Sequence, residues 1–190
     1  MQLVSTPRID FLRGLRDEFV SNYGFGRRIV GVEGFPGSGA GAFADDLSAV
    51  FDEGGVPAFR ASLSDFLLPR SSRGAREAAY DESTFRRVLL DPWRLAGSAG
   101  FQTSAFDADR DVPALSEWKT APADAVMIVD GAYLLGSSLK GIWHFLIYVD
   151  AQQAEGDQAY LAEAAPFFSA SAVVDTSDPE LPKRVLSDSC

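Results

Sequence analysis

Short runs of consecutive apolar residues alternate along the chain with longer segments in which apolar residues recur at helical spacing. The runs predict strands at residues 28–33, 56–62, 125–129, 145–149 and 172–174. Helical spacing predicts helices at residues 8–22, 42–53 and 81–90, the last ended by Asp91-Pro92. Residues 101–106 alternate weakly and are typical of one strand of a β-hairpin. Apolar strands alternating with helices indicate a three-layer α/β fold, in which helices cover both faces of a mostly parallel central sheet.

Small and acidic residues follow the predicted strands. They are Gly34–Gly41, Ser64-Asp65, Asp130-Gly131 and Asp150. In a parallel sheet the carboxyl ends of the strands share one edge, and ligands bind in the crevice outside that edge. We therefore expect these residues to converge on one crevice.

The segment GVEGFPGSGAGAF, residues 31–43, has the outline of a phosphate-binding loop between a strand and a helix. A P-loop has a glycine, four residues, a second glycine, and then lysine and serine or threonine. Gly34 and Gly39 have this spacing, but Ala40 and Gly41 stand where the lysine and the hydroxyl residue belong. The segment predicts the shape of a P-loop NTPase fold without two of its functional side chains.

Two other interpretations of this segment stay open. Gly37, Gly39 and Ala42 match the G-x-G-x-x-A fingerprint of dinucleotide-binding folds. In that fingerprint the first glycine follows the strand closely, whereas residues 34–36 intervene here, so the P-loop spacing fits better. The segment could also be a tight strand-to-helix turn that binds nothing.

The missing side chains limit what the loop can do with a phosphate. A working P-loop cradles phosphates with backbone N–H groups, contacts them with its lysine and binds Mg²⁺ through its hydroxyl. Each charge-assisted contact is worth roughly 1.5–3 kcal/mol, so the loss of two costs about 3–6 kcal/mol. We expect the backbone to keep an anion site but not to support efficient phosphoryl transfer. The candidate phosphate-binding residues are Gly34, Gly37, Ser38, Gly39, Ala40 and Gly41.

Length, charge and cysteine usage narrow the classes of function. The 190 residues suffice for one domain, residues 1–190, with an amphipathic helix in residues 1–24 packed on it. A net charge of −10 argues against nucleic-acid binding, which depends on neutralising phosphates. Neither a membrane span nor a secretory signal is expected from the apolar pattern. The single cysteine, Cys190, favours a cytoplasmic location.

Several short motifs, in order along nearly the whole chain, resemble the uridine kinase and phosphoribulokinase group of P-loop kinases. Besides GFPGSGAG, they are SLSDFLLPR (62–70), the segment leading to Tyr80-Asp81, FQTSAFDADRD (101–111), VMIVDGAYLL (126–135) and ASAVVDTSDPELP (170–182). The resemblance is to the short uridine kinase-like proteins of bacteria in particular. It implies an ATP-dependent kinase fold whose active members use Mg²⁺.

The resemblance also implies roles for individual positions. The family's catalytic acid falls on Ser64, which cannot act as a base at neutral pH. Asp65 beside it is the candidate catalytic residue instead, with a helix N-cap or a local turn carboxylate as its structural alternative. Asp130 corresponds to the acidic residue that supports Mg²⁺, and capping of the next turn is its alternative. The family's lid arginines have no counterpart, because residues 151–168 contain no arginine.

A substrate-side segment is the last element that the resemblance implies. Its candidate residues are Arg70, Arg73, Arg76, Tyr80 and Asp81. The arginines could hold an anionic ligand, or they could pair with the surplus carboxylates of the protein surface.

Two functions follow from these residues. The favoured one is a uridine kinase-like protein, catalytically impaired or inactive, that binds a nucleotide or nucleoside, or a protein partner or second copy of itself, in a regulatory role. The alternative is an active nucleoside kinase that uses ATP and Mg²⁺, in which Asp65 and the arginines take over the missing roles.

Overall fold

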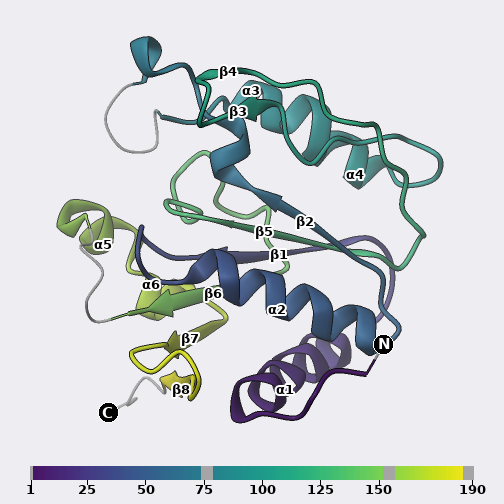
Figure 1. Cartoon of the computed structure of the whole chain (residues 1–190), viewed down its shortest axis with the longest axis vertical. Helices are drawn as coiled ribbons and strands as arrows, with labels where there is room; N and C mark the ends of the chain where they lie inside the picture. Colours follow the sequence, from purple (N-terminus) through teal and green to yellow (C-terminus); the bar gives the residue numbers. More distant parts are fainter. Residues whose placement is uncertain (1, 74–78, 152–156, 186–190) are drawn as a thin grey trace.

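A mostly parallel sheet forms the centre of the protein, which we describe from a computed structural model covering residues 2–73, 79–151 and 157–185. Its strands are β1 (Arg28–Glu33), β2 (Ala58–Ser62), β5 (Val126–Gly131), β6 (Phe145–Asp150), β7 (Ala172–Asp175) and β8 (Lys183–Val185). Within the described residues their order is β2-β5-β1-β6-β7-β8, and only β7 and β8 pair antiparallel (Figure 1). The predicted mostly parallel sheet is confirmed.

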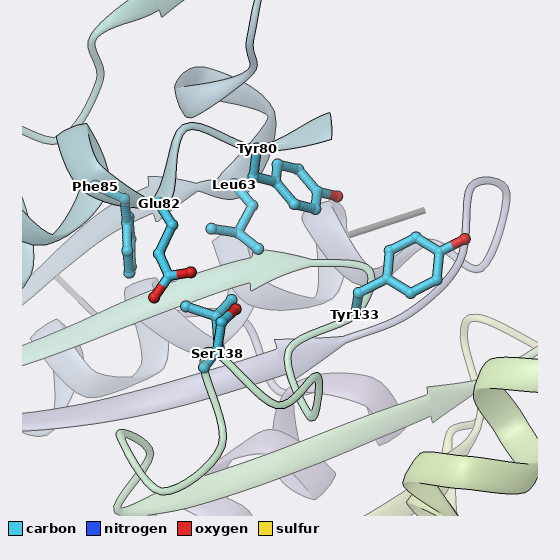
Figure 2. Close-up of a pocket in the computed structure, with 7 residues that line it drawn as sticks. Leu63, Tyr80, Glu82, Phe85, Tyr133 and Ser138 are labelled. Carbon is cyan, nitrogen blue, oxygen red and sulfur yellow. The ribbon is translucent and has the colours of Figure 1, made fainter. Parts of the chain in front are cut away.

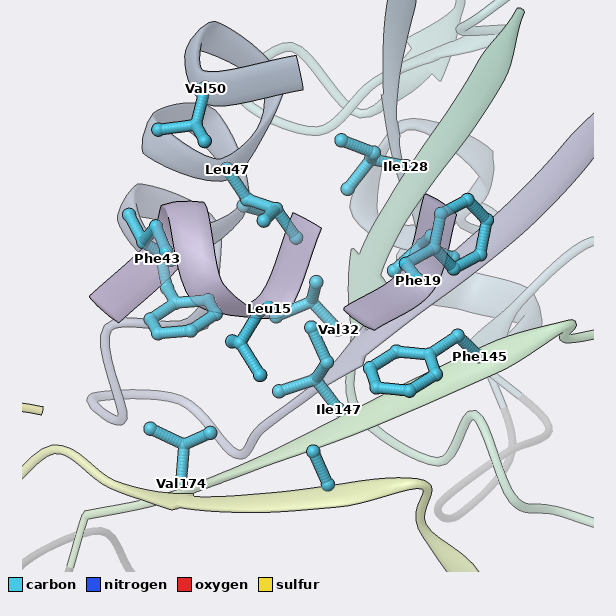
Figure 3. Close-up of a cluster of buried hydrophobic side chains, with 14 of the residues drawn as sticks. Leu15, Phe19, Val32, Phe43, Leu47, Val50, Ile128, Phe145, Ile147 and Val174 are labelled. Carbon is cyan, nitrogen blue, oxygen red and sulfur yellow. The ribbon is translucent and has the colours of Figure 1, made fainter. Parts of the chain in front are cut away.

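One face of the sheet is covered by α1 (Pro7–Asn22) and α2 (Ala40–Glu53). The sequence starts α1 at Thr6, whose hydroxyl accepts the Ile9 N–H at 3.2 Å, and Pro7 occupies the first helical turn. Figure 3 shows the apolar side chains of both helices meeting the strands in one buried cluster. The predicted amphipathic helix near the N-terminus therefore packs against α2 and the sheet.

The opposite face of the sheet is covered by a second helical segment. It consists of α3 (Glu82–Phe85), a π-helical turn (Arg86–Leu90) and α4 (Asp91–Leu95). Its buried side chains pack with those of the strands, as Trp93 and Met127 do in one apolar cluster. Helices thus lie on both faces, and the three-layer arrangement predicted from the sequence is confirmed.

The prediction that this helix ends at Asp91-Pro92 is wrong, because the helix continues to Leu95. Pro92 has no N–H to give to the carbonyl of Val88. The π-helical turn accommodates the proline, with the Asp91 N–H bonded to the Arg86 carbonyl, and the Val88 carbonyl accepts the Gln102 N–H at 2.8 Å instead. Gln102, in the loop that follows, therefore supplies the hydrogen bond that proline cannot make inside the helix.

Shorter elements complete the described chain. A β-hairpin is present, formed by β3 (Phe106–Asp107) and β4 (Val112–Pro113). The strand predicted at residues 101–106 is wrong for most of its length, because only Phe106 belongs to β3 and Phe101 forms an isolated bridge with Lys119. The 3₁₀ turns η1 (Leu63–Phe66) and η2 (Arg70–Ser72) follow β2. The helices α5 (Gln158–Ala164) and α6 (Pro166–Ser169) connect β6 to β7. Among the described residues, no helix has the length and apolar character that a membrane crossing requires.

The packing of α1 generates a stability prediction. Phe19 is 1% exposed and its ring lies 5.5 Å from that of Phe51, so Phe19→Ala leaves a cavity in the core and should lower the free energy of unfolding by about 3–5 kcal/mol. Phe25 is 94% exposed, so the same change there should stay within about 0.5 kcal/mol. Urea unfolding of both variants measures the difference, and equal stabilities would show that α1 contributes no core packing.

Candidate functional site

The glycine-rich segment forms the loop between β1 and α2, at the carboxyl edge of the sheet. Gly39 precedes the first residue of α2 with a left-handed φ of 78°, and Gly37 has a φ of 88°. These values favour glycine at both positions. The first turn of α2 has N–H groups without partners inside the helix, and its dipole favours negative charge there. The backbone at this point is suited to an anion.

The close approach of Gly34 to the next turn fixes the shape of the loop. A Cβ on Gly34 would collide with Ser38 Oγ and come within 2.8 Å of the Ala40 Cβ. Ser38 Oγ accepts the Ala40 N–H at 3.3 Å, and the Thr176 hydroxyl, which follows β7, donates to the Ser38 carbonyl at 3.3 Å. The Ala40 methyl is buried under the loop, at the position where a P-loop carries its lysine.

A cavity of about 560 Å³, here called the loop cavity, opens beside the loop. It is lined by residues 34–41, by Ser62 and Ser64, by Tyr80 and by residues 130–132. The predicted convergence of the loop, Ser64 and Asp130 at the carboxyl edge is present in the structure. Asp65 and Asp150, which the same reasoning placed in the crevice, are not among the lining residues.

Asp130, the candidate metal ligand, ends β5 and is already bonded through both carboxylate oxygens. Its Oδ1 lies 2.8 Å from Arg60 Nη2, and its Oδ2 accepts the Ser62 hydroxyl at 3.1 Å. A Cβ on Gly41 would lie 3.6 Å from Asp130 Oδ2, so a P-loop hydroxyl at that position would face this carboxylate. Glycine provides no such oxygen. The described residues contain no group of three or more histidine, cysteine or acidic side chains placed to hold a metal.

These contacts do not fit a Mg²⁺ site of the P-loop type. Such a site uses the loop hydroxyl together with the strand-end aspartate, and Mg²⁺ requires near-octahedral oxygen ligands. The loop hydroxyl is missing at Gly41, and a guanidinium holds the aspartate.

Asp65, the candidate catalytic residue, lies in η1 beside the loop cavity rather than in its lining. Burial raises the pKa of its carboxyl, and the negative charge of Asp130 raises that pKa further. The cap of η1 is Ser62, which accepts the Ser64 N–H, so the helix-cap role considered for Asp65 belongs to Ser62. Ser64, which has no proton-accepting group at neutral pH, is the member of this turn that lines the cavity.

The substrate-side arginines of the described chain are occupied by other protein groups. Arg73 donates to the Leu68 carbonyl at 2.7 Å and to Asp111 at 3.3 Å. The Arg70 side chain is 64% exposed, donates to the Ala108 carbonyl at 3.2 Å and lies 3.9 Å from Asp111. Neither side chain lines the loop cavity. Arg76 lies outside the described residues. These contacts agree with the surface-pairing alternative for Arg70 and Arg73.

A second cavity adjoins the loop cavity through Tyr80, which lines both. It measures about 200 Å³ and is here called the apolar cavity; its lining is Leu63, Tyr80, Glu82, Phe85, Tyr133, Ser138 and Leu139. Figure 2 shows Glu82 and Ser138 toward one end and Tyr80 and Tyr133 toward the other. Burial raises the pKa of Tyr80 to about 12, so its hydroxyl is protonated at neutral pH. Asp81 lies outside both linings and caps α3 by accepting the Thr84 N–H at 2.9 Å.

Sequence reasoning missed two charged residues that lie next to the site without lining its cavities, Arg60 and Glu33. Arg60 is the guanidinium bonded to Asp130. Glu33, the last residue of β1, is 1% exposed and accepts the hydroxyl of Tyr160 from α5. Burial raises the pKa of Glu33 to about 7, against the opposing effects of the Tyr160 hydroxyl and backbone N–H groups of residues 133–135. In the sequence, each of the two is a charged residue in a segment predicted as a largely apolar strand, and this was the signal that could have indicated them.

Comparison with solved structures assigns the fold. The protein is similar to a possible uridine kinase from Bacillus stearothermophilus, with a TM-score of 0.70, 20% identity, and coverage of 87% of this chain and 96% of that chain. It is also similar to a protein from Silicibacter sp. TM1040 assigned as a fructose transport system kinase, with a TM-score of 0.60, 24% identity, and coverage of 83% and 78%. The chain therefore has the α/β P-loop NTPase fold predicted from its sequence. A comparison with protein-family models finds no match, and neither does a comparison with curated proteins.

The close approach at Gly34 generates a prediction about the loop. Gly34→Ala forces a methyl group against Ser38 and Ala40, and such overpacking should cost about 1–3 kcal/mol of stability. Gly41→Ala is the matched control, because its Cβ meets only Asp130 Oδ2 at 3.6 Å and alanine favours a helix. Thermal or urea unfolding compares the two variants. Equal stabilities would contradict the tight turn described here.

Glu33 generates a pH prediction. Its pKa in the folded protein is about 7, above the ordinary value of 4.5, so the folded state binds more protons between these values. The resulting stabilisation is fully present below pH 4.5 and is lost as the pH rises through 7. At about 1.4 kcal/mol per pKa unit, the wild type should lose about 3 kcal/mol relative to Glu33→Gln across this range. Unfolding measured from about pH 5 to pH 8 tests this, and a stability difference that does not change with pH would contradict it.

Proposed function

We propose that this protein is a P-loop kinase-like protein that binds a phosphate-bearing ligand, such as a nucleotide, and has little or no phosphotransfer activity. The observation that carries the proposal is the state of the loop. Its backbone has the glycine conformations and the helix start of a phosphate cradle, while the lysine position holds the buried methyl of Ala40. Binding through the main chain is retained, and the cation that stabilises the transferred phosphoryl group is missing.

The groups around the loop cavity support the same conclusion. Phosphoryl transfer relies on positioning and on charge stabilisation, which a loop lysine, a metal and a catalytic carboxylate normally supply. Here the corresponding positions are Ala40, Gly41 and Ser64, and Asp130 is bonded to a guanidinium. Such a protein would act by binding, with a nucleotide, a nucleoside or a protein partner as its regulatory ligand.

One observation favours the alternative of an active kinase. Asp65 lies in the turn whose Ser64 lines the loop cavity, and its raised pKa brings the carboxyl closer to the range of a general base. For catalysis the turn would have to re-aim Asp65 into the cavity. Phosphoryl transfer by this route would also require ATP and a charge to replace the missing lysine.

Ligand binding gives the first test of the proposal. Titration calorimetry with ATP and with pyrophosphate should detect binding to the wild type, and saturating ligand should raise the melting temperature. Gly41→Asp places a carboxylate in the lining of the loop cavity and should weaken binding roughly tenfold or more, since like charges repel at this site. Gly41→Asn has nearly the same size without the charge and should retain most of the affinity. Equal affinities of these variants would place the anion elsewhere.

The rate of phosphotransfer from ATP gives the second test of the proposal. Kinases commonly turn over at roughly 1–100 s⁻¹, and we expect the wild type to fall far below this range with ATP and uridine or cytidine. The variant Ala40→Lys/Gly41→Thr/Ser64→Asp restores the three missing side chains and serves as the comparison. Wild-type turnover at about 1 s⁻¹ or faster would establish the active-kinase alternative.

A further inference from the structure

Arg60 bonds Asp130, the strand-end carboxylate that a P-loop protein uses to support its divalent metal. We propose that the guanidinium of Arg60 replaces that metal as the counter-ion of Asp130, so that a phosphate-bearing ligand is bound here without Mg²⁺. The ligand part of this inference rests on the proposed function. The metal part rests only on the contacts of Arg60 and Asp130.

The guanidinium of Arg60 is held by five protein acceptors. Its Nε lies 2.9 Å from Asp45 Oδ1 on α2, and its Nη1 donates to the carbonyls of Ala61 and Ile128, each at 3.0 Å. Its Nη2 bonds Asp130 at 2.8 Å and lies 3.5 Å from the Gly41 carbonyl in the first turn of α2. The cation therefore bridges β2, β5 and the helix that follows the phosphate loop, and every N–H group has a protein acceptor.

The position of Arg60 follows from strand register. Arg60 and Ser62 are two residues apart in β2, so their side chains share one face of the sheet, and Ser62 pairs with Asp130 of β5. The two side chains therefore meet the Asp130 carboxylate together, one oxygen each. Asp130 is 13% exposed and Arg60 23% exposed, so the pair is largely removed from water.

Asp130 held in this way is a poor metal ligand while Arg60 stays in place. A divalent ion at either carboxylate oxygen would lie close to the guanidinium on Oδ1, and two cations at such short range repel each other. The loop hydroxyl that would share the ion is absent at Gly41, whose Cβ position faces Asp130 Oδ2 at 3.6 Å. Arg60 thus balances the charge of Asp130 within the protein. A phosphate bound at the loop would therefore lie near an ion-paired aspartate, which repels it less than a free carboxylate would.

The metal part is tested with Mn²⁺ alone, which substitutes for Mg²⁺ and is followed by the loss of its free electron paramagnetic resonance signal. Wild type and Asp130→Asn should bind Mn²⁺ equally weakly, because Asp130 is not available. Arg60→Met should bind roughly tenfold more tightly than Arg60→Met/Asp130→Asn, since the freed carboxylate can then take the ion. Wild-type Mn²⁺ binding that is lost in Asp130→Asn would overturn the proposal.

Arg8→Met is the matched control for loss of an arginine pair. Arg8 of α1 bonds Asp46 of α2 at 2.6 Å, next to the Asp45 that Arg60 contacts, and it does not line the loop cavity. It should leave Mn²⁺ binding as in the wild type. Were Arg60→Met to unfold, the comparison of wild type with Asp130→Asn would still decide the proposal, since it uses no Arg60 variant.

The ligand part is tested with pyrophosphate in EDTA and in excess Mg²⁺. The wild type should bind at least as tightly in EDTA as in Mg²⁺, because the metal-free anion carries more negative charge to the cradle and no carboxylate is free to hold the metal. Binding that requires Mg²⁺ would overturn the inference. If pyrophosphate binds in neither buffer, the proposed function is wrong, and the Mn²⁺ titration still decides the role of Arg60.

Discussion

The arrangement of β1 is the constraint on which the rest of the structure depends. β1 pairs with β5 on one side and β6 on the other, and it is buried along its whole length. The chain leaves β1 through residues 34–39 and enters α2, and this turn is so tight that a Cβ on Gly34 would collide with Ser38 and Ala40. The same burial draws Glu33 into the interior, where its carboxylate loses water. Loop shape, cavity position and the raised pKa of Glu33 therefore share one origin.

Much of the fold could be predicted because the pattern of apolar residues is local. Each buried strand forms a nearly continuous apolar run, and each covering helix shows its own period, so the order of elements follows from the chain. The errors arose where a distant group decided the outcome. The helix through Pro92 survives because Gln102, ten residues on, takes the orphaned carbonyl of Val88. The strand β8 is exposed throughout and depends on pairing with β7, so no periodicity indicated it.

The candidate site also has a part that the sequence predicts and a part that depends on distant residues. Its backbone parts were predictable, because glycine positions encode turns and a helix start in the sequence itself. Its charged contacts were not predictable, because Arg60 and Asp130 lie on strands that become neighbours only in the folded sheet. In the same way, Glu33 and Tyr160 are far apart in the sequence and meet only in the fold. A sequence shows which side chains a loop lacks. It does not show that a cation from another strand, Arg60, pairs with the Asp130 carboxylate.

The pairing of Arg60 with Asp130 is not explained by stability alone. Removing two charges from water is costly, and an apolar pair of similar size is often as stable or more so. The pair nevertheless places a guanidinium against the first turn of α2, beside a cradle built from main-chain groups. A divalent ion supplies strong but exchangeable charge, whereas an arginine held by five acceptors is permanent. A cradle with such a counter-ion is suited to hold an anion in place, and it is poorly suited to the changes of charge that accompany phosphoryl transfer.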